Sequence, residues 1–285
     1  MNGLSSGVDK GALLVEFIGA TGAGKSTLVA ALSDALAGRG LRVREAHDVI
    51  LARHGLAWAP GRHTRSALVY FLALLSSVRC VCRRDGFRLG RLAVRTIVRD
   101  AGGLRIGAGL LRNVVKRIGT DGLLRKLRPG LGDCDVVLCD EGLVHAAHNL
   151  FVHAGSLPRK EEIALFGELV PRPDLLVWVT APTEWSAEVI RRRGHPRVAA
   201  TPEAARAFAE HARETFEVLS SLPGLRERIY RLDNPGRAGG PGRPAVDALA
   251  ALIVERLRRP RRPDPAPAPQ SAVPASVPTS VPSAP

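Results

Sequence analysis

Five short apolar runs are spread along the chain, and longer stretches with helical periodicity lie between them. The runs have the length and composition of buried strands; they are Leu13–Ile18, Leu41–Ala46, Val136–Asp140, Leu175–Thr180 and Arg228–Leu232. Among the intervening stretches, Ala204–Leu222 and Ala245–Leu257 each place apolar side chains on one helical face. Strands that alternate with helices favour crossover units. The pattern therefore predicts an α/β fold built on a five-stranded parallel sheet.

The same pattern divides the chain into three parts. Residues 11–259 carry the predicted elements and are expected to form one domain, in which residues 52–133 are a mostly helical insertion between the second and third strands. Residues 260–285 are rich in Pro, Ala, Ser and Val, and such a tail cannot bury enough apolar surface to fold. Residues 1–10 are expected to be a flexible N-terminus.

Neither the first ten residues nor the most apolar stretch of the chain has the pattern of a signal peptide or a membrane span. The first ten residues lack a cationic segment followed by an apolar one, and residues 67–78 are too few to span a bilayer. The four cysteines show no C-x-x-C spacing and are predicted to be reduced core thiols; they are Cys80, Cys82, Cys134 and Cys139. We therefore expect a cytoplasmic protein.

A glycine-rich segment connects the first predicted strand to a helix. Its sequence, Gly19-Ala20-Thr21-Gly22-Ala23-Gly24-Lys25-Ser26, fits the phosphate-binding pattern G-x-x-x-x-G-K-[ST] at every position, and Thr27 continues into the helix. Glycines let backbone N–H groups point at an anion, and the helix N-terminus adds partial positive charge. Lys25 is predicted to reach the β- and γ-phosphates of ATP, and the Ser26 hydroxyl to ligate Mg²⁺.

The third predicted strand ends in two acids, Asp140 and Glu141. An apolar strand that ends in Asp is the Walker-B pattern, and Asp140 is predicted to hold Mg²⁺ beside Ser26. Glu141 has two interpretations: it orients a water or accepts a proton, or it is a solvated acid at the end of a strand.

After the fourth strand, a helix that follows Pro182 leads into Arg191, Arg192 and Arg193. Here the chain resembles the thymidylate kinase-like family of P-loop kinases. The resemblance implies the three-layer P-loop NTPase sandwich and a basic lid, with Arg191 and Arg193 acting on the phosphates. The family has Asp-Arg after the third strand where this chain has Asp140-Glu141, which argues against a nucleoside monophosphate acceptor. The alternative for the arginines is a solvated helix end.

Most of the positive charge lies in the insertion. The whole chain has a net charge of +14, and residues 79–128 hold fourteen Lys or Arg and three acids. Five arginines share a helical spacing that can grip anions; they are Arg84, Arg88, Arg91, Arg95 and Arg99. Residues Arg84–Arg128 could thus contact an anionic acceptor, membrane surface or polymer, or simply be a solvated face. No binding module accompanies the charge, which disfavours nucleic acid.

Two further groups of residues lie near the predicted site. His145, His148 and His153 follow Asp140 without a carboxylate or Cys to complete a metal set, so they are interpreted as surface or acceptor-site histidines. Asp48, at the end of the second strand, is the candidate base for an acceptor hydroxyl.

These features favour an ATP- and Mg²⁺-dependent kinase of a small acceptor, for which an anionic molecule is one candidate. The first alternative is a P-loop ATPase or nucleotide-dependent regulator that uses Asp140-Glu141 for hydrolysis, although no Asn-Lys-x-Asp guanine motif or LSGGQ signature is present. The second is a nucleotide-binding scaffold that docks through the insertion. The acceptor, a preference for ATP over GTP and a homodimer are left open.

Overall fold

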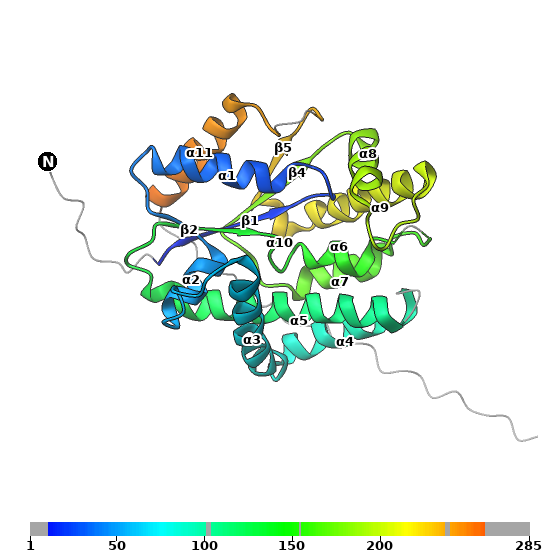
Figure 1. The fold of residues 1–285 in the computed structure, drawn as a ribbon, viewed down its shortest axis with the longest axis horizontal. Helices are drawn as coiled ribbons and strands as arrows, with labels where there is room; N and C mark the ends of the chain where they lie inside the picture. Colours follow the sequence, from blue (N-terminus) through cyan, green and yellow to red (C-terminus); the bar gives the residue numbers. More distant parts are fainter. Residues whose placement is uncertain (1–10, 101–103, 154, 237–239, 260–285) are drawn as a thin grey trace, which may run out of the picture.

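The computed structural model describes residues 11–100, 104–153, 155–236 and 240–259 (Figure 1). Within them, five parallel strands form one sheet in the order β2-β3-β1-β4-β5. The strands are β1 (Leu13–Ile18), β2 (Val43–Glu45), β3 (Val136–Asp140), β4 (Leu175–Thr180) and β5 (Ile229–Asp233). The predicted α/β fold with a five-stranded parallel sheet is confirmed. The predicted flexible N-terminus and the Pro/Ala-rich tail lie outside the described residues.

Helices cover both faces of this sheet (Figure 1). On one face, α1 (Lys25–Ala37) and α11 (Arg243–Arg258) pack on alternate residues of β1, namely Leu13, Val15 and Phe17. The other face is covered by α2 (Ala46–Arg53), α5 (Leu104–Leu127), α6 (Ala146–Phe151), α7 (Lys160–Leu169) and α9 (Pro202–Ser221). Three layers result, because each buried strand presents apolar side chains to both faces.

The remaining helices lie in two connections, one between β2 and β3 and the other between β4 and β5. The insertion holds α3 (Arg62–Val81) and α4 (Arg84–Asp100) before α5, and a short 3-10 turn, Arg128–Gly130, follows it. Between β4 and β5 the chain forms α8 (Thr183–Arg193), α9 and the short α10 (Pro223–Arg226). The predicted helical insertion is confirmed. Its helix α3 lies so close to α5 that a side chain at Gly119 would overlap the carbonyl of Ala73.

Among the described helices, none alone has the length and apolar composition to cross a bilayer; His63–Cys80 and α4, bent by 114°, meet that test only as a pair.

The cysteines differ from the prediction in one respect. All four are free thiols, and Cys134 and Cys139 are buried as expected. Cys80, near the end of α3, is half-buried and packs against the core, whereas Cys82, directly after α3, is exposed. The prediction of four core thiols is therefore wrong for Cys82.

Candidate functional site

The glycine-rich loop connects the carboxyl end of β1 to the first turn of α1. Gly22 and Gly24 have φ values of 84° and 94°, a region that side chains with a Cβ rarely adopt. A Cβ at Gly22 would overlap Val189 of α8, and one at Gly24 would overlap the amide of Asn234. Asn234 is buried and donates from Nδ2 to the Ala23 carbonyl at 2.9 Å. The loop is thus held in shape between α8 and the end of β5.

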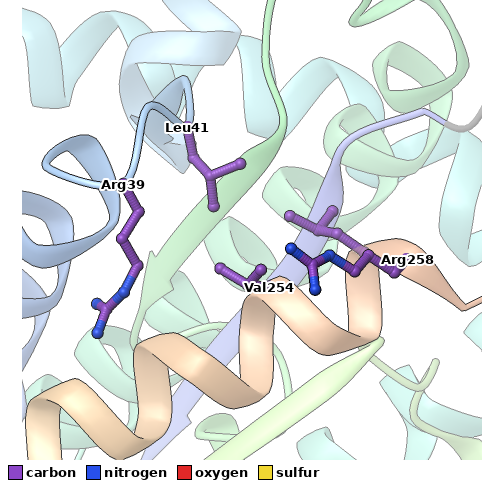
Figure 2. A pocket seen from close by; sticks show the side chains of 5 residues that line it. Arg39, Leu41, Val254 and Arg258 are labelled. Carbon is purple, nitrogen blue, oxygen red and sulfur yellow. The ribbon is translucent and has the colours of Figure 1, made fainter. Parts of the chain in front are cut away.

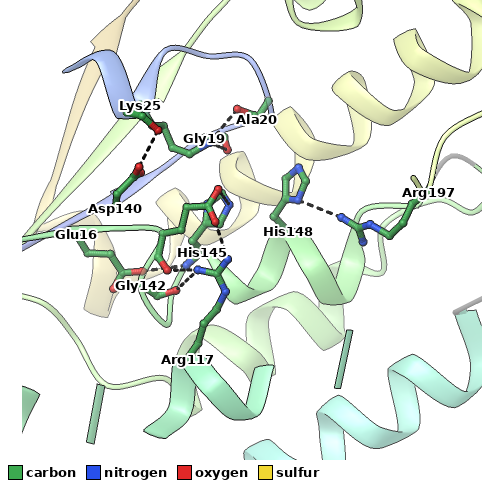
Figure 3. A network of polar contacts seen from close by, with 12 residues as sticks. Glu16, Gly19, Ala20, Lys25, Arg117, Asp140, Gly142, His145, His148 and Arg197 are labelled. Carbon is green, nitrogen blue, oxygen red and sulfur yellow. Dashed lines mark hydrogen bonds and ion pairs between the residues drawn. The ribbon is translucent and has the colours of Figure 1, made fainter. Parts of the chain in front are cut away.

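Lys25 turns back over this loop (Figure 3). Its ammonium donates to the carbonyls of Gly19 at 2.9 Å and Ala20 at 3.0 Å, and the residue is 8% exposed. Burial lowers the pKa of Lys25, and the nearby carboxylates Glu141 and Asp140 act in the opposite direction. The predicted phosphate-binding lysine therefore lies over the loop, where an incoming phosphate can exchange for the carbonyl contacts.

Ser26 and Asp140 meet across the gap between α1 and β3. The Ser26 hydroxyl donates to Asp140 Oδ2 at 2.7 Å, because β1 and β3 are neighbours and end at the same edge of the sheet. A hydroxyl and a carboxylate are hard oxygen donors, which suit Mg²⁺. The described residues contain no cluster of three or more metal-binding side chains.

Glu141 is held in an unusual backbone conformation by an arginine from the insertion. Its φ is 61°, and it is the single non-glycine residue with positive φ in the described chain. Arg117 of α5 pairs with the Glu141 carboxylate at 2.8 Å and also donates to the carbonyls of Glu141 and Gly142. Such strain persists where surrounding contacts over-determine it, and it is frequent at functional sites.

The charge state of Glu141 follows from the same neighbours. Partial burial raises the pKa of its carboxyl, but Arg117 and Lys25 outweigh this effect and bring the pKa to about 2. Glu141 is therefore ionised at neutral pH. Because its carboxylate is already paired with Arg117, its geometry suits orientation of a bound group.

A second carboxyl, Glu16, lies beneath this loop in the middle of β1. It is 3% exposed and accepts a hydrogen bond from the His145 backbone N–H at 2.9 Å. Burial raises its pKa to about 8 despite this bond. Its side chain also lies where a Cβ of Gly142 would be. Sequence reasoning missed Glu16, although an acid inside an apolar strand was the available signal.

Glu16→Gln is expected to change how stability depends on pH. The folded wild type keeps Glu16 protonated to about pH 8, whereas the unfolded chain releases that proton near pH 4.5, so this group costs stability as pH rises through that interval. Between pH 6.5 and 8 the free energy of unfolding of wild type should fall by about 1.5 kcal/mol relative to Glu16→Gln. Urea titrations at several pH values measure it, with Glu203→Gln as an exposed control. A constant difference across this window would contradict the assignment.

His145 and His148 are buried beside the loop, so their interpretation as surface residues is wrong; only His153 is partly exposed. The two rings stack at 5.3 Å between centroids and pack on Phe216 of α9. Burial moves the pKa of both well below 6.5, so both are neutral. His145 Nε2 lies 3.6 Å from Glu141, and His148 Nδ1 lies 3.5 Å from Arg197. The two rings thus connect the start of α6 to α9.

The three arginines that end α8 are all exposed, and two of them, Arg191 and Arg193, differ in their surroundings. Arg191 pairs with Glu188 of its own helix at 2.7 Å, while Arg193 is near enough to Lys25 to lower its pKa. The segment after α8 is anchored by Arg197, which sequence reasoning missed. It donates to the Asn149 and Val152 carbonyls. In the predicted lid, Arg191, Arg192 and Arg193 are thus exposed, while the segment that follows them is held in place at Arg197.

Asp48 and one arginine of the basic stripe are held in ion pairs. Asp48, the predicted base, is in the first turn of α2 and forms an ion pair with Arg65 of α3. On α4, Arg99 is withdrawn from the predicted stripe because it pairs with Glu162 of α7 at 2.7 Å and with Asp100. Arg88, Arg91 and Arg95 remain exposed.

A separate pocket of about 500 Å³ is not part of this site. Figure 2 shows its lining residues, Arg39, Leu41, Val254 and Arg258, near the carboxyl ends of α1 and α11. Because Lys25 begins α1, the length of the helix places the pocket roughly 20 Å from the glycine-rich loop.

No family model matches the chain, and a search of curated proteins finds no match. Among solved structures, it is similar to thymidylate kinase from Ehrlichia chaffeensis, with 12% identity and a TM-score of 0.41. It is also similar to deoxyadenosine kinase from M. mycoides with bound dATP, with 11% identity and a TM-score of 0.39. Each alignment covers 87% of this chain and 100% of the other. The proposals below rest on this chain's own residues.

Proposed function

We propose that this protein is a cytoplasmic kinase that transfers the γ-phosphoryl group of ATP to a small acceptor. The observation that carries the proposal is the contact between Ser26 and Asp140 at 2.7 Å, directly beside the loop that Lys25 covers. A hydroxyl, a carboxylate and a lysine on a glycine-rich loop form the set that binds a nucleoside triphosphate with its metal. The residues proposed to hold the nucleotide are Gly19 to Thr27.

Different residues of the site are proposed to contact the phosphates, to hold the metal and to neutralise charge during phosphoryl transfer. Lys25 would move from the loop carbonyls to the β- and γ-phosphates and neutralise charge that develops during transfer. Ser26 and Asp140 would hold Mg²⁺, which when bound neutralises phosphate oxygens. Arg193 would approach the γ-phosphoryl from the end of α8, and Arg191 would do so after exchanging Glu188 for phosphate.

The acceptor is proposed to lie where α5 meets the loop after β3. Arg117 and Lys116 bring positive charge to this place, and the pKa of Lys116 is lowered first by burial and then by Arg117. These cations support an anionic acceptor. Asp48 is retained as the candidate base, which requires exchange of Arg65 for the acceptor hydroxyl.

The ion pair between Glu141 and Arg117 favours this proposal over a P-loop ATPase. A hydrolase that relies on Glu141 needs its carboxylate free to accept a proton from water, and here that carboxylate is held by Arg117 at 2.8 Å. We therefore expect phosphate release from ATP alone to be slow, below the rough range of 1–100 s⁻¹ that kinases reach with their substrates.

The test is ADP formation by wild type and Glu141→Gln, first with Mg·ATP alone and then with nucleosides, nucleotides, sugars, and sugar or polyprenyl phosphates. The kinase proposal expects slow ADP formation that rises at least about 10-fold with one acceptor class. Fast ADP formation by wild type without an acceptor, lost in Glu141→Gln, would establish the ATPase instead. Glu203→Gln, at an exposed glutamate in the first turn of α9, controls for the loss of one carboxylate.

A further inference from the structure

One face of α3 exposes large apolar side chains to solvent. Phe71, Leu74, Leu75 and Val78 are 57%, 41%, 56% and 62% exposed. Their spacing places them on the same side of the helix. The opposite side of α3, with Val69, Ala73 and Ser77, is buried, and this helix packs on α5. The apolar face is therefore additional to the core contacts of α3.

The neighbouring helix α4 contacts α3 and also exposes apolar side chains, with basic ones among them. Phe87, Val94 and Val98 are 61%, 47% and 82% exposed. Arg88, Arg91 and Arg95 are exposed among them, while Leu89, Leu92, Ala93, Thr96 and Ile97 are buried. Residues 62–100 contain nine arginines and two acids, and one of those acids, Asp100, pairs with Arg99. The exposed faces of α3 and α4 thus combine apolar and basic side chains.

We propose that the exposed faces of α3 and α4, hereafter the α3–α4 surface, dock on an anionic lipid bilayer. Phenylalanine, leucine and valine side chains gain by entering the boundary between headgroups and acyl chains, and arginines gain from the negative surface potential above it. Both helices have one face buried in the protein, so they would lie on the bilayer rather than cross it. In Figure 1, α3 and α4 form the outer side of the molecule beyond α5.

Charge and side-chain chemistry favour a bilayer over two other partners. A second copy meeting this surface by two-fold symmetry would place arginine against arginine. Nucleic acid would satisfy the arginines, but aliphatic residues such as Leu75, Val78 and Val98 offer no ring on which a base can stack. An anionic bilayer satisfies both kinds of side chain at once.

The proposal does not depend on the kinase reaction, and its test measures binding alone. The full-length protein is mixed with vesicles of phosphatidylcholine, with or without about one third phosphatidylglycerol, and the bound fraction is measured by co-flotation. Two variants change the α3–α4 surface: Arg88→Gln/Arg91→Gln/Arg95→Gln, and Leu75→Ser/Val78→Ser. The control Arg213→Gln/Arg243→Gln/Arg259→Gln removes the same charge from exposed arginines on or beside α9 and α11. Circular dichroism checks that each variant is folded.

Wild type is expected to bind the anionic vesicles and to bind neutral ones weakly. The triple arginine variant should partition about 100-fold more weakly at low salt, since each arginine near the surface contributes roughly 5-fold. The serine variant should lose at least about 10-fold, and the control should bind like wild type. The proposal is overturned if wild type does not bind anionic vesicles, if both surface variants bind as wild type does, or if the control loses as much as the triple variant. Self-association or nucleic-acid binding through these residues without vesicle binding would also overturn it.

Discussion

Replacing Asp140 with asparagine is expected to lower Mg²⁺-dependent turnover by at least about 100-fold while ATP still binds. The variant keeps the size of the side chain, and its amide oxygen can still accept from the Ser26 hydroxyl. It removes the negative charge that would hold the metal beside that hydroxyl. A metal that neutralises phosphate charge supplies several kcal/mol to the transition state, and each 1.4 kcal/mol changes the rate about 10-fold.

The matched control for this prediction is Asp135→Asn. Asp135 lies directly before the first residue of β3, whereas Asp140 is the last residue of that strand. At this opposite end of β3, Asp135 forms an ion pair with Arg42 at 2.8 Å. Its variant should change stability slightly and leave the Mg²⁺ dependence of turnover intact. If Asp140→Asn retains full activity at low Mg²⁺, another carboxylate holds the metal and the proposed role of Asp140 is wrong.

The parts of the site that follow from local sequence could be predicted. The glycine-rich motif fixes the loop, and the apolar runs fix β1, β3 and β4 at the bounds that the structure has. Because neighbouring parallel strands end at one edge of a sheet, Asp140 was expected beside Ser26, and the two are in contact. Here residue spacing and chain direction are sufficient.

Contacts that depend on the orientation of a long helix could not be predicted. Arg117 lies 24 residues before Glu141, on a helix of the insertion, and the sequence does not tell which of its basic residues turns toward the sheet. The burial of His145 and His148 likewise depends on how α9 packs over α6. Glu16 is different, because its place inside an apolar strand was visible in the sequence and its burial follows from the strand's central position.

Lys25→Ala is expected to weaken the binding of Mg·ATP by roughly 2–4 kcal/mol, which corresponds to about 30- to 1000-fold in affinity. The buried ammonium is the cation that lies over the loop, and its two carbonyl contacts show that it reaches across the space above Gly19 and Ala20. Alanine removes the buried side-chain stem as well as the ammonium. Lys25→Met is therefore the second variant, since it keeps an apolar stem and removes the ammonium with its charge and its two hydrogen bonds. Lys160→Ala serves as the exposed control.

Isothermal titration calorimetry of wild type and Lys25→Met with Mg·ATP tests the central claim, nucleotide binding by the glycine-rich loop, most directly. The account predicts saturable binding of one nucleotide per wild-type chain and an affinity reduced by at least about 30-fold in the variant, with both proteins equally folded by circular dichroism. Binding of equal strength by wild type and Lys25→Met, or an absence of binding by folded wild type, would contradict it.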